Sequence, residues 1–132
     1  MSRRTRGESG SVSLLVVIMV PALLIAAGLV LDGGRQLEAR REARGAAQAA
    51  ARAAVQQSGD ELLGAGIDLD AAIGRAEAAL AAQGAVGSVA VVGGAVVVTV
   101  SRAVDFLVLP GGVTVTEQAS AVAVAGIEEG GG

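Results

Sequence analysis

The sequence contains no cysteine, histidine, lysine, tyrosine or tryptophan, and Phe106 is its one aromatic residue. Without cysteine or histidine the chain has no thiol nucleophile, no imidazole base and neither of the usual side-chain ligands of zinc or haem. The absence of lysine also excludes Schiff-base chemistry. Because no disulfide can form, cysteine usage says nothing about the redox compartment. These absences predict a protein that is not an enzyme and that uses no cofactor and no small-molecule substrate.

Acidic residues do not supply a metal site in their place. Asp60, Glu61, Asp68 and Asp70 form the one acidic cluster, and their spacing is not that of a calcium-binding loop. Asp68 and Asp70 are better explained as residues that cap a helix. We therefore predict no metal site.

Charge is unevenly distributed along the 132 residues. All ten positive side chains are arginine, and the formal net charge is −3. Residues 1–11 carry a net charge of +2, so the rest of the chain carries −5. A basic leader before an apolar segment is a membrane-targeting pattern, and an acidic remainder argues against nucleic-acid binding.

An apolar segment follows the basic leader. Residues 14–31 contain no charged side chain and include thirteen Leu, Val, Ile or Met residues. With the three residues before it, the segment forms a helix of roughly 30 Å, which matches the hydrocarbon core of a bilayer. We predict a leader at 1–10 and a transmembrane helix over 11–32, in which Pro21 and Gly28 are candidate helix-packing residues. The alternative is a secretory signal peptide that is cleaved near Ile25-Ala26-Ala27.

Residues 33–58 are predicted to form an alanine-rich juxtamembrane helix, after a break at Asp32-Gly33-Gly34. Alanine recurs at three- and four-residue spacing on one face, while arginine and glutamine occupy the opposite face. Small side chains permit another backbone to approach closely, so this stripe packs either on the chain's own sheet or against partner helices. The alanine stripe comprises Ala39, Ala43, Ala46, Ala47, Ala50 and Ala54.

Residues 59–126 are predicted to form a small α+β domain, followed by a disordered tail at 127–132. Asp68 or Asp70 is a suitable N-cap for a helix that ends at about Gln83, with Gly84 at the C′ position. The predicted buried side of this helix comprises Ile73, Ala76 and Leu80.

Alternating valine then predicts strands. A Gly-Gly pair between Val89–Val92 and Ala95–Ser101 is typical of a tight β-hairpin, and a turn at Pro110-Gly111-Gly112 precedes a third strand over 113–124. The predicted fold class is therefore α+β. It has an N-terminal transmembrane helix continuing into an alanine-rich helix, a short second helix and a three-stranded antiparallel sheet.

The N-terminal part carries a more specific pattern. Pro21 falls eleven residues after Gly10, and Asp32, Gly34 and Arg35 follow the apolar segment. This arrangement, with the alanine-rich stretch after it, resembles the TadE/TadG-like family, which comprises pseudopilin-like proteins of the tight-adherence (Tad or Flp) pilus apparatus. The resemblance covers roughly residues 6–55, and it implies a pilin-like architecture with Asp32, Gly34 and Arg35 as a membrane-exit motif.

The resemblance also implies processing, orientation and partners. Prepilin peptidase would cut between Gly10 and Ser11 on the cytoplasmic side, and the C-terminal domain would be extracytoplasmic. The implied partners are membrane lipid, other pilus or secretion-apparatus subunits and the peptidase. Processed members carry a glutamate five residues past the glycine, where this sequence has Leu15, and the TadG-like branch also lacks it. The cleaved and uncleaved forms therefore both stay open.

We accordingly expect a single-pass protein of the bacterial cell membrane. It would be a minor pseudopilin or a membrane-anchored assembly component of a Tad/Flp-type pilus or a related type II secretion-like system. Its action would be non-covalent packing, for which the candidate residues are Pro21, Gly28, Ala43, Ala47, Ala50 and Ala54. The alternative is a membrane-tethered binding or regulatory module unrelated to pili.

Overall fold

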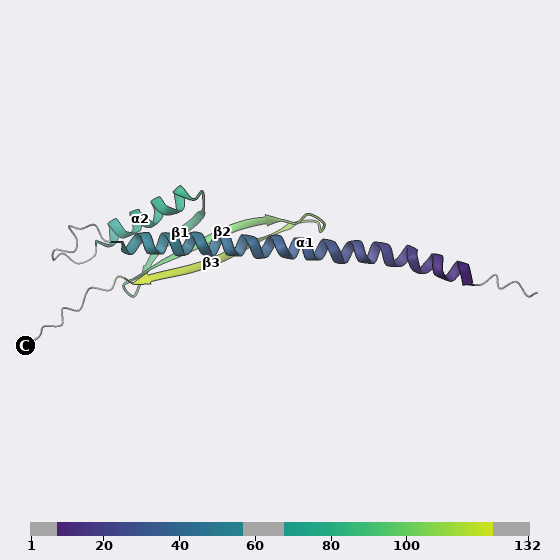
Figure 1. Cartoon of the computed structure of the whole chain (residues 1–132). Helices are drawn as coiled ribbons and strands as arrows, with labels where there is room; N and C mark the ends of the chain where they lie inside the picture. Colours follow the sequence, from purple (N-terminus) through teal and green to yellow (C-terminus); the bar gives the residue numbers. More distant parts are fainter. Residues whose placement is uncertain (1–7, 57–67, 123–132) are drawn as a thin grey trace, which may run out of the picture.

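A computed structural model of the chain describes residues 8–56 and 68–122. One long helix forms a rod, and a shorter helix and a sheet pack only along its C-terminal half (Figure 1). This arrangement confirms the predicted α+β fold class with a three-stranded antiparallel sheet. The elements in chain order are α1 (Glu8–Val55), α2 (Leu69–Ala82), β1 (Val86–Val92), β2 (Ala95–Asp105) and β3 (Gly112–Val122).

The helix α1 is continuous over 48 residues, a length of about 70 Å at 1.5 Å per residue. It passes through Pro21 and also through Asp32-Gly33-Gly34, so the predicted break at the second position was wrong. Each glycine costs about 1 kcal/mol relative to alanine in a helix interior, but it leaves the backbone hydrogen bonds intact. Packing of the following turns on the rest of the chain offsets that cost.

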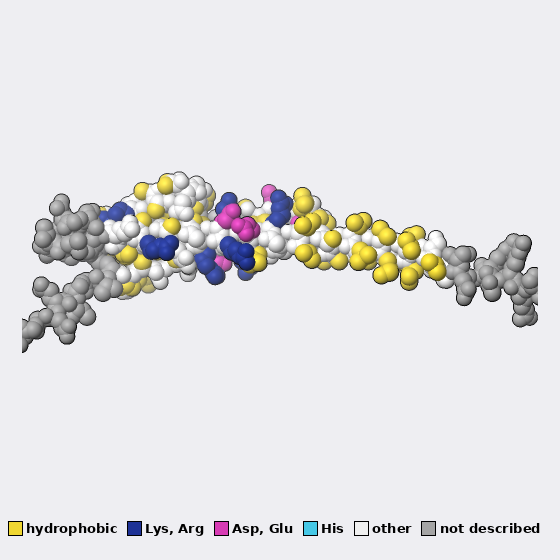
Figure 2. Space-filling model, in the orientation of Figure 1, with side chains coloured by type: hydrophobic (Ala, Val, Ile, Leu, Met, Phe, Trp, Pro, Cys, Tyr) yellow, Lys and Arg dark blue, Asp and Glu magenta, His cyan; other side chains and the backbone are white. Residues whose placement is uncertain are grey.

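The N-terminal half of α1 is exposed over almost its whole surface, and Gly28 is its one buried position among residues 10–31. In its most apolar stretch of 18 residues only 6 % is buried by the rest of the chain, whereas the core helix of a soluble protein would be mostly buried. Figure 2 shows this half as an apolar surface that ends where charged side chains begin. By its length and composition, the helix fits a single-pass membrane anchor.

The sheet has the order β1-β2-β3, with both pairs antiparallel. Val92 pairs with Ala95 across the predicted hairpin turn, where Gly93 and Gly94 have φ values of 57° and 81°. Such positive angles favour glycine, which explains why this pair forms the turn. The central strand β2 is longer than β1, so its residues 102–105 pair with β3 alone.

The helix α2 begins and ends at the predicted capping residues. The Asp68 carboxylate accepts hydrogen bonds from the backbone N–H groups of Asp70 (3.0 Å) and Ala71 (3.3 Å), so Asp68 is the N-cap. Gly84 follows the helix with a φ of 60°. On the buried side, Ala76 and Leu80 are confirmed, whereas Ile73 is only half-buried.

The main core lies between α1, α2 and the inner face of the sheet. The alanine stripe of α1 contributes five of its twelve buried residues, and α2 contributes Ala72, Ala76 and Leu80. The sheet contributes three valines of β2, of which Val98 and Val100 are the largest fully buried side chains. Because alanine is small, the backbone of α1 approaches the sheet closely along this face. The end of the predicted third strand, the predicted tail, Asp60 and Glu61 lie outside the described residues.

Candidate functional site

The most distinctive site lies where α1 changes from anchor to domain helix. Asp32 is the one charged side chain that is buried among the described residues, with 3 % of its surface exposed. Its carboxylate accepts hydrogen bonds from three consecutive backbone N–H groups of the β2–β3 loop: Leu107 at 2.7 Å, and Val108 and Leu109 at 3.2 Å each. Hydrogen bonds to an ionised acceptor are stronger than neutral ones, so this carboxylate fixes the loop to α1.

Gly28, one turn before Asp32, allows the same loop to lie directly on the helix. A Cβ atom at this position would stand 2.5 Å from Val108 Cγ1 and 2.9 Å from Val108 Cβ, closer than real Cβ contacts come. Glycine is therefore required here by the approach of Val108. We call Gly28, Asp32 and the loop residues 106–111 the exit clamp.

Arg35 adds a third contact to the same end of the sheet. Its Nη1 atom donates a long hydrogen bond of 3.5 Å to the backbone oxygen of Asp105. Gly34 has no such contact, because a Cβ atom built on it would meet nothing within 4 Å. Of the predicted membrane-exit motif, the structure thus brings Asp32 and Arg35 to the β2–β3 loop and leaves Gly34 apart.

Sequence reasoning missed the partner of this motif. The loop was predicted only as a turn, and its three apolar residues Leu107, Val108 and Leu109 were given no role. The signal that could have found it is a run of apolar side chains at a turn, where polar residues are usual.

The other predicted site residues lie in different surroundings. Ala43, Ala47, Ala50 and Ala54 are at most 1 % exposed, and they pack on the chain's own α2 and sheet. In this conformation they cannot contact a partner helix. Pro21, Gly10 and Ser11 lie on the exposed N-terminal half of α1, Gly10 and Ser11 near its first turn.

Polar contacts hold the domain onto the C-terminal half of α1. Arg44 of α1 forms an ion pair of 2.9 Å with Glu117 of β3, and Glu42 pairs with Arg102 of β2. At the end of the helix, Arg75 of α2 donates a hydrogen bond of 3.1 Å to the backbone oxygen of Ala54. Such a donor satisfies a carbonyl that the helix end leaves without an intrahelical partner. These contacts come from all three neighbours of α1 and oppose its separation from the domain.

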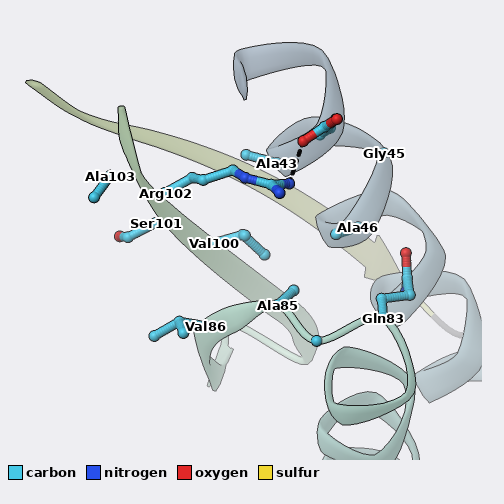
Figure 3. Close-up of a pocket in the computed structure, with 12 residues that line it drawn as sticks. Ala43, Gly45, Ala46, Gln83, Ala85, Val86, Val100, Ser101, Arg102 and Ala103 are labelled. Carbon is cyan, nitrogen blue, oxygen red and sulfur yellow. Dashed lines mark ion pairs between the residues drawn. The ribbon is translucent and has the colours of Figure 1, made fainter. Parts of the chain in front are cut away.

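A groove of about 530 Å³ opens between α1, the α2–β1 turn and β2. Figure 3 shows the small side chains that line it, among them Ala43, Ala46 and Ala85, with Arg102 reaching across one end to its ion-pair partner on α1. The groove exists because β1 begins at Val86 and leaves the adjoining part of β2 uncovered on that side. Small side chains and one ion pair suit packing against another surface. Within 8–56 and 68–122, no group of three acidic side chains is arranged to hold a metal ion.

Comparison with known proteins finds a family match for the N-terminal part of the chain. Residues 10–57 match the family model described as putative Flp pilus-assembly TadE/G-like. The matched segment is the anchor together with the alanine-rich half of α1, and it includes Gly28, Asp32 and Arg35. No curated protein and no solved structure matches the chain. The resemblance to the TadE/TadG-like family is thereby confirmed over this segment, and it supports a component of pilus assembly.

Proposed function

We propose that this chain, which is TadE/G-like over residues 10–57, is a minor pseudopilin or membrane-anchored assembly component of a Tad/Flp-type pilus or a related secretion system. It acts by non-covalent packing, with no catalytic step. The observation that carries the proposal is the unbroken helix α1, which joins an exposed apolar span to a packed domain. Its partners are membrane lipid and other subunits of the apparatus.

A continuous helix suits a component that transmits position or force. There is no hinge between anchor and domain in α1, and the exit clamp fixes the domain to the helix at the point where the span ends. A displacement of neighbouring subunits against the domain would therefore move the anchor with it. The alanine stripe packs against α2 and the sheet of the same chain. The surfaces that remain for partners are therefore the anchor itself and the outer surface of the domain.

Processing and orientation are parts of the same proposal. Prepilin peptidase is the processing partner, with cleavage between Gly10 and Ser11 on the cytoplasmic side, and the domain lies outside the membrane. Edman sequencing or intact-mass analysis of protein extracted from membranes tests the cut, with Gly10→Leu as the variant that abolishes it. A mature start at Ser11 supports the pseudopilin form, whereas an intact Met1 leaves the TadG-like anchor. Recovery of the full-length chain from the aqueous fraction overturns both.

The absence of cysteine makes the orientation simple to measure. In a Ser88→Cys variant, an exposed position on β1 carries the one thiol of the chain. A membrane-impermeant maleimide should label it in intact spheroplasts, while a Ser2→Cys variant that also carries Gly10→Leu, and so keeps its leader, should react only after lysis. Labelling with the opposite sidedness would refute an extracytoplasmic domain.

The role in assembly needs a cellular readout. Deleting the gene in the organism that encodes the protein should abolish surface pili, and the full chain should restore them. A variant that lacks residues 83–122 and so keeps only the anchor and the two helices should fail to restore them. Normal piliation of the deletion strain would favour a membrane-tethered module unrelated to pili.

A further inference from the structure

The β2–β3 loop carries an apolar surface that the domain does not use. Leu107 is 65 % exposed, Val108 is 49 % exposed and Leu109 is 39 % exposed, and the three are consecutive. Loops on soluble domains are usually polar, and a contiguous exposed apolar patch marks an interaction site. The place where this loop contacts α1 indicates what covers the patch.

The exit clamp places the loop beside the last turn of the apolar span. Val108 lies against Gly28, and the loop N–H groups bind Asp32, the first charged residue after the span. At 1.5 Å per residue, Gly28 lies about 5 Å before the end of the span at Leu31. The tip of the loop is the part of the domain that reaches farthest toward the anchor (Figure 1). A bilayer that covers the span up to Leu31 therefore also meets the loop.

The backbone of the loop is prepared for an apolar environment. Backbone N–H groups without partners are costly in lipid, since no water is present to satisfy them. Here Phe106 donates to the Gly111 oxygen at 3.0 Å, and the next three N–H groups donate to Asp32. Pro110 has no N–H group. Five consecutive residues thus present no unpaired backbone donor.

Apart from the buried Asp32, the charged side chains that follow the span begin on the domain side of the loop. Asp105 and Arg35 are in contact next to the clamp, on its domain side. The ion pair of Glu42 and Arg102 lies farther along α1 and β2, away from the span. Figure 2 shows charged side chains gathered at the end of the apolar surface. This change from apolar to charged side chains is the pattern expected where a protein passes through the membrane interface.

We infer that Leu107, Val108 and Leu109 enter the lipid bilayer next to α1, as a second membrane contact of this chain. Interfacial segments place apolar side chains about 5–10 Å into the boundary between headgroups and acyl chains, which agrees with the depth of Gly28. A second contact on one side of α1 restricts the directions in which the helix and the attached domain can tilt in the membrane. The inference rests on the anchor of the proposed function.

Fluorescence in vesicles tests the inference directly. The full chain, with a single cysteine at Leu107→Cys that carries the environment-sensitive dye NBD, is reconstituted at about one copy per phosphatidylcholine vesicle. We expect a blue-shifted emission, quenching by lipids with a nitroxide near the headgroup, and little quenching by aqueous iodide. A second label at Leu109→Cys guards against a local disturbance by the dye.

Two matched labels separate the possible failures. Ser88→Cys lies opposite Thr99, six residues along β2 from Asp105 and so about 20 Å from the loop, and should behave as a residue in water. Leu24→Cys in the span should be quenched by lipids with a nitroxide deep in the acyl chain. If Leu24 is not quenched, the anchor itself is refuted. If Leu24 is quenched while Leu107 and Leu109 remain open to iodide, the loop is not a membrane contact and its partner is another protein.

Discussion

Replacement of Ala47 by leucine tests whether the alanine stripe is an internal packing surface. Ala47 is completely buried in the cluster that also holds Val98 and Val100. Leucine has three more side-chain carbon atoms than alanine. The neighbouring helix and sheet cover this position completely, so the added atoms must displace their side chains. Inserting such a group into a well-packed core costs about 1–3 kcal/mol.

The opposite interpretation predicts no such loss. If the stripe were an open surface in the isolated protein, the three extra carbons would face the solvent, and the free energy of unfolding would change by less than about 0.5 kcal/mol. The two interpretations therefore predict clearly different free energies of unfolding for this variant.

Calorimetry of the full-length protein in detergent micelles is the suitable assay, because the chain lacks tryptophan and tyrosine and has no useful intrinsic fluorescence. For a domain of this size, a loss of 1–3 kcal/mol lowers the Tm by about 4–20 °C. The control is Gln48→Leu, which places the same side chain on the exposed face of the helix and should change stability by less than about 0.5 kcal/mol. An unchanged or higher Tm for Ala47→Leu would refute the assignment of the stripe to the chain's own core.

Three further changes probe the exit clamp and the sheet. Gly28→Ala should be less stable than Gly33→Ala by about 1–3 kcal/mol in the same calorimetric assay, since both gain helix propensity but only the first forces the loop away. Equal Tm values for the two would show that the loop adapts freely. Asp32→Ala should speed amide hydrogen exchange at Leu107–Leu109 while leaving the β1–β2 hairpin protected, and unchanged exchange at the loop would contradict the role of this carboxylate. Val98→Ala removes two methyl groups from a fully buried site and should cost about 2–3 kcal/mol in denaturant unfolding, with a smaller loss arguing that the core collapses to fill the space.

Much of the fold was predictable because its signals are local. The turn at Gly93-Gly94 needs positive φ angles, and the cap at Asp68 needs a carboxylate within reach of the first free N–H groups, so the turn and the start of α2 lie where they were predicted. The outer ends of the hairpin strands were predicted too short, because β1 begins three residues before Val89 and β2 ends four residues after Ser101. The break at Asp32-Gly33-Gly34 was wrong for the complementary reason. Glycine lowers helix propensity, but tertiary contacts on the next turns of α1 outweigh a cost of about 1 kcal/mol per residue.

The exit clamp could be located from the sequence but not understood from it. Gly28, Asp32 and Arg35 were singled out by their pattern around the apolar span, and the family match covers them. Their common partner is separated from Asp32 by more than seventy residues of chain. No periodicity or capping rule links positions so far apart, because only the antiparallel pairing of β2 with β3 returns the loop to the start of the domain.

By itself the sequence determined the apolar span, the fold class and the lack of cysteine, histidine and lysine, since hydrophobicity, turn chemistry and residue types are properties of the chain alone. The tertiary structure decided which surface each segment contacts. It turned the alanine stripe inward onto the sheet, seated Val108 on Gly28 and bound three loop amides to Asp32. These outcomes depend on the distances between elements that are remote in sequence, and those distances are fixed only when the core is packed.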